Sequence, residues 1–344
     1  TVNDYALPYR GSDYEYVLVN IFQALNYVQL GQADEALVEA RDLDSKFSVV
    51  EERARNARRG HFEDNGFARL FMGLVYEAAG RGQDLNDAWI AYRQALALYD
   101  GYYGGRYVPS LLQERLLALA ARFSDPDLGE LERRFPHMVG QARKGLEGKA
   151  VVYLVHCVGY SPVKVEEVLP VPLNDGFVTK VAVPRFARRP YAVRGSRLVA
   201  GPAAGSGARV VDSELGADIE DIAQRDLESR RALTLSKAVL RPGLKYLVER
   251  KQKENVRKKY GDGAAEALTV VSDIYNLFTE KADLRSWQSL PAQIRIARMV
   301  LEPGPYRLKV HELGEGGELV STEDLGDLEM VAGETRFFLR RAYR

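Results

Sequence analysis

The sequence predicts an α+β protein, in which an N-terminal α-helical repeat region precedes a mixed, β-rich, sandwich-like region. Apolar residues recur at helical spacing up to about residue 147, and strand-like segments follow from Val151 onward. A chain of 344 residues is also too long for one ordinary compact core. We therefore predict a helical domain at 1–148 and a β-rich domain at 149–344, with a helical insertion at about 214–281.

The composition is that of an ordinary globular protein, with 46% apolar and 28% charged residues. Its formal net charge is zero, so the whole molecule has no field that would select nucleic acid. Cys157 is the only cysteine, which excludes an intramolecular disulfide and a thiolate metal cluster. It lies in an apolar run, and we expect it to be buried and unreactive.

An internal repeat opens the chain. Its two units present small residues, a tyrosine and a glycine in nearly the same order, namely Ala24, Tyr27, Gly31, Ala36 and Ala40, then Gly73, Tyr76, Gly80, Ala88, Tyr92 and Ala95. Small residues let antiparallel helices approach closely, and the glycine after the tyrosine can end the first helix. This pattern indicates helical hairpins of tetratricopeptide type, with helices at about 15–31, 33–46, 64–80 and 85–100.

Further helices follow, because Leu112, Leu116, Leu119 and Phe123 continue the helical spacing. Asp125-Pro126 ends that helix, and another is expected from about residue 128 to 146. Two hairpins alone would leave apolar faces open, so these later helices are expected to cap the stack.

Strand signals begin at Val151, where apolar residues start to alternate. Further strands are predicted at 164–169, 177–183, 192–199 and 208–211, and after Trp287 around 294–296, 306–310 and 337–339. Turns at 314–317 and 332–333 are read as hairpin turns. The first set of strands is too small and too rich in proline to form a core alone. We therefore expect the strands after Trp287 to complete the sheet that begins at Val151.

Between the two sets, helical spacing returns. Leu215, Ile219, Ile222 and Ala223 are expected to open one helix, and charged and apolar helices are expected at 245–259 and 268–278.

No catalytic, cofactor or metal motif is found. The Gly/Ser-rich loop at 201–207 lacks the Gly-Lys-Ser/Thr ending of a phosphate-binding loop. The four histidines are scattered without a ligand spacing, and no G-x-S-x-G elbow nominates a nucleophile. We expect neither a cofactor nor a metal, and a non-enzymatic role.

Two clusters are candidate binding sites. Tyr99, Tyr102, Tyr103 and Tyr107 follow the second hairpin, where they can anchor a partner protein or cover the end of the helix stack. A basic segment with interleaved aromatics contains Arg185, Arg188, Arg189, Arg194 and Arg197. Such a segment can bind an anionic polymer, although it can also form an exposed loop or strand face.

Short stretches at both ends of the chain carry a family resemblance. The N-terminal ones are Asn3-Asp4-Tyr5, Tyr14-Glu15, Ala24-Leu25-Asn26-Tyr27 and Val38-Glu39-Ala40-Arg41. The C-terminal ones are Asp283 to Trp287, Leu290-Pro291 and Pro303-Gly304-Pro305-Tyr306-Arg307-Leu308. They resemble an uncharacterised family of bacterial envelope lipoproteins with a tetratricopeptide-like N-terminal region. The last stretch also resembles β modules of PEGA type.

That resemblance implies a periplasm-facing lipoprotein of the outer membrane, associated with CsgG-like or LpoB-like lipoproteins. The lipid anchor that it implies is not present in this chain, which has no lipobox cysteine. The family offers no catalytic residues to carry over.

Three hypotheses for the function follow. The first is a protein–protein interaction adaptor or scaffold of the cell envelope, whose helical groove binds a partner protein. The second is a binder of peptidoglycan or an anionic polysaccharide through the segment from Arg185 to Arg197. The third is an enzyme without a sequence signature.

Overall fold

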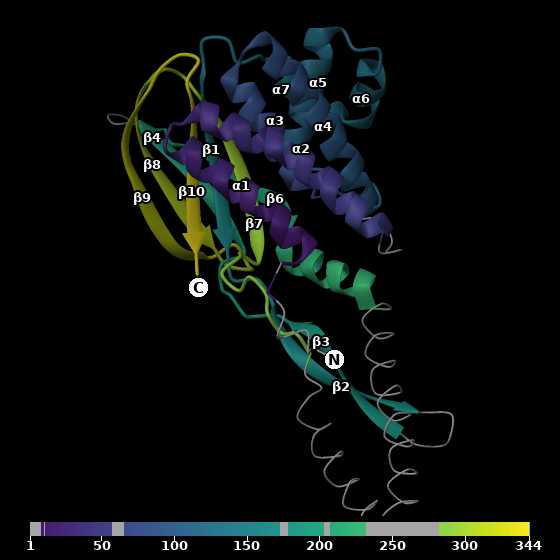
Figure 1. Ribbon diagram of the computed structural model, residues 1–344. Helices are drawn as coiled ribbons and strands as arrows, with labels where there is room; N and C mark the ends of the chain where they lie inside the picture. The colour runs from purple at the N-terminus through teal and green to yellow at the C-terminus, as the bar shows by residue number, and fades with distance from the viewer. Residues whose placement is uncertain are drawn as a thin grey trace, which may run out of the picture. The chain divides into compact units, whose positions relative to one another are not determined.

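The computed structural model describes residues 8–9, 11–56, 65–172, 178–202, 207–231 and 282–343. Helices form the N-terminal part and β-sheets follow, which confirms the predicted α+β class (Figure 1). No helix in these ranges is long and apolar enough to cross a membrane.

The chain forms two compact units, and each is described by itself. Unit 1 comprises Thr1–Ser12, Pro162–Arg188 and Ala223–Gln288, and unit 2 comprises the rest of the chain. Unit 2 therefore contains both helices and sheets. The predicted boundary at 148–149 marks the change from helix to strand, and its status as a domain boundary stays a prediction.

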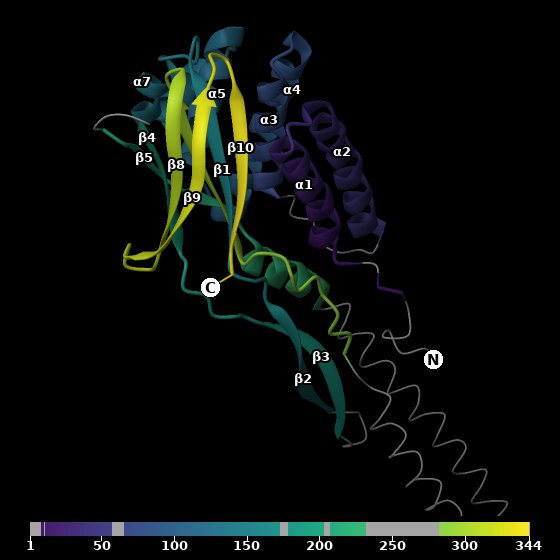
Figure 2. The same ribbon diagram turned by 90° about the vertical axis from the view of Figure 1, so that its left-hand side faces the viewer.

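Two pairs of helices joined by short turns begin unit 2. They are α1 (Asp13–Gln29) with α2 (Ala33–Asn56), which lie side by side in Figure 2, and α3 (Gly66–Ala79) with α4 (Gly82–Tyr103). Ala36 and Ala88 are fully buried, and a Cβ on Gly73 would overlap the ring of Tyr92. Small residues thus permit the close approach that the sequence predicts. The tetratricopeptide assignment itself stays a prediction.

The helix that carries Leu112 and Phe123 is confirmed, whereas the one expected after it is shorter than predicted. The later helices are α5 (Ser110–Phe123), α6 (Leu128–Arg134), a 3-10 turn η2 (Pro136–Met138) and α7 (Val139–Ala142). The prediction of one helix from 128 to 146 is wrong, because Pro136 has no backbone N–H to continue the ladder of α6. Phe135 leaves the helical conformation immediately before it, with φ −122° and ψ 53°.

The described residues of unit 2 form two four-stranded sheets. Sheet A has the order β10-β1-β7-β6, formed by Thr335–Ala342, Ala150–Val158, Gln293–Leu301 and Glu214–Asp218. Sheet C has the order β5-β4-β8-β9, formed by Arg209–Asp212, Gly195–Pro202, Gly304–Leu313 and Leu319–Met330. Each sheet combines strands from before and after the insertion.

The pairing confirms that the strands after Trp287 complete the sheet begun at Val151. Tyr153 lies opposite Phe337 in the parallel pair β1–β10, and Val155 lies opposite Ile296 in the antiparallel pair β1–β7. The predicted hairpin turn at 314–317 joins the antiparallel strands β8 and β9. The turn at 332–333 is not a hairpin turn, because it leads from sheet C to sheet A.

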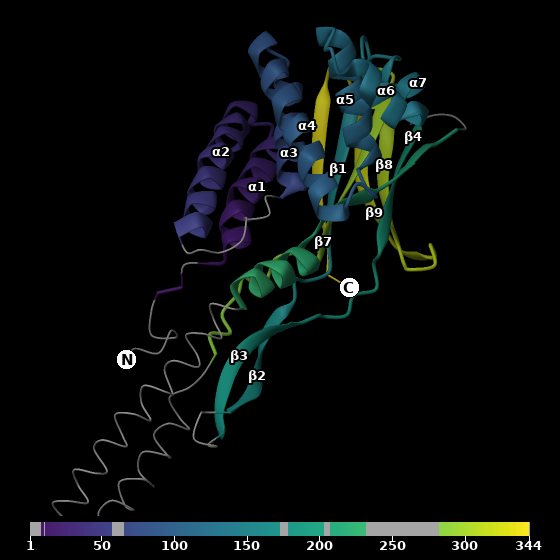
Figure 3. The ribbon, with the colours of Figure 1, turned by 90° about the vertical axis from the view of Figure 1, so that its right-hand side faces the viewer.

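Strand β1 is buried on both faces. One face contributes Val152 and Leu154 to the core between the two sheets, where Leu198 and Leu308 meet them. On the other face, Tyr153 stacks on Phe337 at a centroid distance of 4.9 Å. Figure 3 shows α3 and α4 on one side of β1 and strands β4 and β8 on the other. A helical layer, sheet A and sheet C therefore form three layers, and β1 lies in the middle one.

Helix α3 fills the space against sheet A with aromatic side chains. Phe67 and Phe71 are fully buried, and Phe71 meets Phe337 edge to face at 6.1 Å. A Cβ on Gly216 of β6 would come within 2.6 Å of the Phe67 ring, so a glycine is needed for this approach. The inner side of α3 is thus packed on the chain's own sheet.

Buried charges also join the helices to sheet A. Glu114 of α5 forms an ion pair with Arg298 of β7, and the two side chains are only 4% and 5% exposed. Arg115, next along α5, forms an ion pair with Glu77 of α3. Gln141 of α7 donates a hydrogen bond of 2.6 Å to Glu114. The carboxylates of Glu114 and Glu77 are therefore each matched by an arginine.

Unit 1 is built around the antiparallel pair β2 (Val163–Pro172) and β3 (Val178–Ala187). Residues 219–231 form a helix, of which 223–231 belong to unit 1. The expected start of the helical insertion is wrong, because 214–218 form strand β6 and pair with β7. The helices expected at 245–259 and 268–278 lie outside the described residues.

Candidate functional site

The four candidate tyrosines are held by residues of unit 2. The Tyr99 side chain is 2% exposed, and its hydroxyl donates a hydrogen bond of 2.7 Å to the carbonyl of Gly216 in β6. The hydroxyl of Tyr107 donates to the carbonyl of Leu215, at 2.6 Å. Burial raises the pKa of both phenols, so both remain donors at neutral pH.

The other two tyrosines complete an aromatic cluster. The Tyr102 hydroxyl donates a 2.6 Å hydrogen bond to Asp221, and the Tyr103 ring lies 4.7 Å from that of Tyr102 and 5.2 Å from that of Tyr107. All four side chains thus pack against one another, and three of them bond to residues 215–221. Such contacts are expected of tyrosines that cover the end of the helix stack. A partner-binding role for them stays a prediction.

Strand β6 also supplies the N-terminal cap of α5. The two carboxylate oxygens of Glu214 accept hydrogen bonds from the backbone N–H groups of Ser110 and Leu111, at 2.6 and 2.8 Å. Burial raises the pKa of Glu214 above its ordinary value, although these two donors favour the charged form. The residues around the tyrosines therefore connect α4 and α5 to β6.

The basic segment is divided between the two units. Arg185 and Arg188 belong to unit 1 and are exposed, whereas Arg189 belongs to unit 2. The Nε of Arg189 donates to the carbonyl of Ser161 at 2.8 Å, and its guanidinium lies 4.6 Å from the ring centroid of Tyr160. Burial lowers the pKa of Arg189, and so does the nearby charge of Arg341.

The remaining arginines of this segment also have partners in unit 2. Arg194 stacks over Tyr191, at 4.1 Å from the ring centroid. Arg197 forms an ion pair with Asp212 across β4 and β5, with Nε 2.6 Å from Oδ1. The structure thus distributes the segment over separate contacts, and Arg185 lines a pocket.

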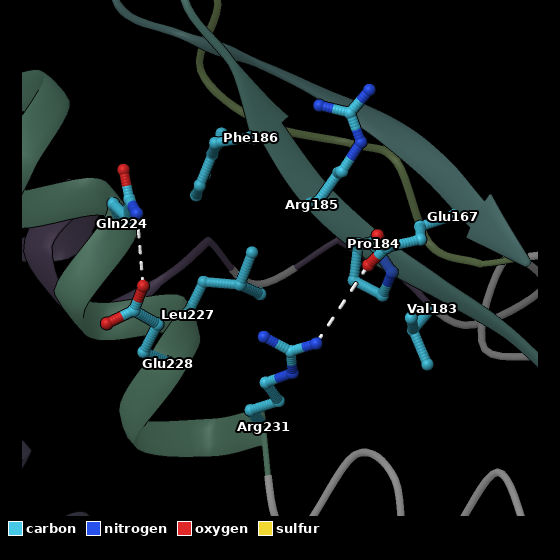
Figure 4. A pocket seen from close by; sticks show the side chains of 9 residues that line it. All are labelled: Glu167, Val183, Pro184, Arg185, Phe186, Gln224, Leu227, Glu228 and Arg231. Atoms are coloured by element: carbon cyan, nitrogen blue, oxygen red, sulfur yellow. Dashed lines mark hydrogen bonds and ion pairs between the residues drawn. The ribbon is translucent and has the colours of Figure 1, made fainter. Parts of the chain in front are cut away.

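That pocket lies in unit 1 and has a volume of about 240 Å³ (Figure 4). Four consecutive residues of β3, from Val183 to Phe186, line its strand side, together with Glu167 of β2. Glu167 lies directly opposite Val183 in the register of the two strands. Val183 is 4% exposed, so it forms an apolar base for this side.

The helix formed by residues 219–231 provides the other side. Gln224, Leu227, Glu228 and Arg231 recur at spacings of three and four residues, which places them on one helical face. The amide of Gln224 donates to the carboxylate of Glu228, at 3.0 Å. Leu227 and the guanidinium of Arg231 both point toward the strand residues in Figure 4.

The pocket combines apolar walls with polar groups of both signs. Val183, Pro184, Phe186 and Leu227 are apolar, whereas two arginines and two glutamates carry opposite charges. Its volume lies below the roughly 300–1,000 Å³ of typical small-molecule and cofactor sites. Within the described ranges, no three His, Cys, Asp or Glu side chains lie close enough to hold a metal ion. The arrangement is therefore best suited to holding one side chain of a larger partner.

Sequence reasoning singled out Arg185 and missed the other residues of the pocket. Glu167 and Leu227 lie 60 positions apart in the chain, and no motif connects them. One signal that could have found them is the helical spacing of Gln224, Leu227, Glu228 and Arg231, which places these residues on one face of a helix. The β2–β3 hairpin was a second signal, since two strands alone need another element to pack against.

No protein-family model, curated protein or solved structure matches this chain.

Proposed function

We propose that this protein is a non-enzymatic interaction adaptor or scaffold that contacts a partner protein through the pocket of unit 1. The pocket of about 240 Å³ carries the proposal, because it has the size and the apolar walls to receive a side chain of a partner. The helical groove is a weaker choice than the sequence suggested. Phe67 and Phe71 of α3 are fully buried, and Phe71 packs on Phe337 of β10.

The cellular setting of the proposal rests on the sequence resemblance. On that basis we propose a periplasmic adaptor, associated with the outer membrane through a lipid anchor. CsgG-like or LpoB-like lipoproteins are its proposed partners. The two hairpins α1–α2 and α3–α4 are proposed to be of tetratricopeptide type, in keeping with Ala36, Gly73 and Ala88 at their contacts.

Site-specific photo-crosslinking tests the adaptor proposal. A photoreactive benzoylphenylalanine replaces Phe186, which lines the pocket, or Val168, which is 52% exposed on β2 and does not line it. In cells that express the chain naturally, we expect a covalent adduct of one defined mass from position 186 and not from position 168. Adding Leu227→Asp should remove the adduct, because a carboxylate would then occupy an apolar wall.

Two results would contradict the adaptor proposal. One is the same set of adducts from both positions, since that pattern reports exposure and no particular surface. The other is the absence of any adduct from position 186.

A second candidate function is binding of peptidoglycan or an anionic polysaccharide. One cluster in unit 2 favours it. The guanidinium groups of Arg189 and Arg341 lie 4.6 and 5.4 Å from the ring of Tyr160, and Tyr343, which is 60% exposed, lies 5.3 Å from Arg341. Two cations beside one exposed and one half-buried aromatic ring can hold a carboxylate and stack on a sugar.

A sedimentation assay with purified cell-wall sacculi tests this second function. We expect binding to weaken between about 50 and about 500 mM salt, because screening reduces attraction between charges. Tyr343→Ala should weaken binding at low salt. Binding that depends neither on salt nor on Tyr343 would contradict the second function.

A further inference from the structure

A pair of opposite charges with no direct hydrogen bond between them spans the pocket of unit 1. The Nη2 of Arg231 lies 4.0 Å from a carboxylate oxygen of Glu167, which is too far for a hydrogen bond. Their side chains are 57% and 38% exposed, and neither has a hydrogen-bond partner among the described residues. Both groups therefore keep their capacity to donate or accept. Figure 4 shows the guanidinium directed across the pocket toward Glu167.

Apolar side chains flank this pair. Leu227 projects from the helix, and Val183 and Phe186 come from β3. A ligand in the pocket thus meets a donor and an acceptor at one point and apolar walls beside it. A peptide unit has the same two features, because its carbonyl accepts, its N–H donates, and its side chain stands next to both.

We infer that the pocket of unit 1 recognises an extended peptide segment of a partner protein through one apolar residue and its adjoining peptide group. The apolar side chain packs between Leu227 and Val183. The peptide carbonyl accepts from Arg231, and a peptide N–H donates to Glu167. This inference rests on the proposed adaptor function and specifies what the partner presents.

Two alternative occupants fit the pocket less well. An anion would meet Glu167 and Glu228 as well as the two arginines, so the lining charges do not favour it. A strand added along the edge of β3 would meet Pro184, which has no N–H to pair with it. A peptide that inserts one residue avoids both difficulties.

Three small probes separate these possibilities in the intact chain with isotope-labelled Leu and Val methyl groups. N-acetyl-leucinamide carries the side chain with neutral amides, N-acetyl-leucinate carries it with a carboxylate, and 3-methyl-1-butanol carries it without an amide. The readout is the methyl resonances of Leu227 and Val183, which lie in the pocket itself. We expect N-acetyl-leucinamide to bind roughly two- to tenfold more tightly than the alcohol, because its carbonyl and N–H groups can bond to Arg231 and Glu167 at the same time, whereas the alcohol has a single hydroxyl.

A matched pair of variants identifies the origin of that gain. Arg231→Met keeps an apolar stem and removes the donors, so it should reduce the advantage of the amide over the alcohol to the part that Glu167 contributes. Arg230→Met makes the same change in charge at the neighbouring residue, which pairs with Asp226 and does not line the pocket. The advantage of the amide should persist in this control.

Several outcomes would overturn the inference. Equal binding of the amide and the alcohol would show that a peptide group adds nothing beyond one hydroxyl, which overturns peptide-group recognition and leaves the adaptor proposal standing. Tighter binding of N-acetyl-leucinate would show an anion site. If no probe shifts the Leu227 and Val183 methyls, peptide-group recognition is wrong, and the crosslinking at position 186 still decides the adaptor proposal by itself.

Discussion

Gly73 lies where the ring of Tyr92 crosses helix α3. A Cβ at this position would overlap the ring, whereas a Cβ on Gly101 of α4 would meet no atom within 4 Å. We predict that Gly73→Ala lowers the free energy of unfolding by about 1–3 kcal/mol, because the ring and the helix must move apart.

Gly101→Ala is the matched control, since it makes the same change inside a helix. We expect it to leave stability unchanged or to raise it by up to about 1 kcal/mol. Urea denaturation followed by circular dichroism measures both variants. If the two variants unfold at the same urea concentration, the close approach of α3 and α4 is not required.

Cys157 is buried in β1, as the sequence predicted, and burial raises the pKa of its thiol from 9.0 to about 12. The folded protein therefore keeps the thiol protonated at a pH where the unfolded chain ionises. Stability from this group is complete below pH 9 and is lost as the pH rises toward 12.

We predict that Cys157→Ala makes the fall in unfolding free energy above pH 9 less steep, by up to about 1.4 kcal/mol per pH unit. Urea denaturation of both proteins between pH 8 and pH 10 measures the slopes, and the buried tyrosines contribute equally to both. If the unfolding free energy falls with the same slope in both proteins, the pKa of the Cys157 thiol is not raised by burial. So would rapid labelling of the folded wild type by a thiol reagent.

At the scale of elements, the ion pair between Glu114 of α5 and Arg298 of β7 links the helical layer to sheet A. Both side chains are about 95% buried. We predict that Arg298→Met destabilises the protein by about 1.5–3 kcal/mol, because it removes the hydrogen-bonded cation of a buried carboxylate and leaves Glu114 only Arg115, whose Nη1 lies 3.7 Å from Oε1, and the amide of Gln141.

Arg197→Met provides the comparison. Its partner is Asp212, and these side chains are 42% and 60% exposed, so the loss should stay below about 1 kcal/mol. Thermal and urea unfolding of both variants would show the difference. If both variants lose the same unfolding free energy, burial does not determine how much the Glu114–Arg298 pair contributes to stability.

The elements themselves could be predicted well from local patterns. Helical spacing located α3 and α5, and alternation located β8. Local patterns failed where a tertiary contact decided the outcome. Leu215 carries helical spacing with Ile219, yet it lies in β6, because that segment pairs with β7 and receives Phe67 against Gly216.

The candidate site was harder to predict than the fold. Arg185 was chosen for its charge, and it does line the pocket. Leu227 and Glu167 have ordinary surroundings in sequence and become a site only where the helix packs on the hairpin. The tyrosines were chosen as a candidate binding surface because they cluster in the sequence. In the structure, three of their hydroxyls donate hydrogen bonds to residues 215–221 of the same chain.

At the scale of the whole molecule, sheets A and C depend on pairing between distant parts of the chain. A fragment of residues 283–344 retains β7 to β10 but keeps only the pairing of β8 with β9. We predict that this fragment, expressed alone, is unfolded or insoluble, because a single hairpin is marginal in water. Circular dichroism during heating checks this, and a soluble fragment with a sharp, cooperative transition would contradict it.

The middle position of β1 also has a consequence for synthesis on the ribosome. Its parallel neighbour β10 is translated last among the described strands, at Thr335–Ala342. At roughly 5–20 residues per second, the apolar segment from Ala150 to Val158 emerges on the order of ten seconds or more before that neighbour. During this interval β1 has no partner on its β10 edge, even after β7 (Gln293–Leu301) has been made for its other edge. An open strand edge promotes aggregation, so the yield in the cell should depend on chaperones that shield β1 until translation is complete.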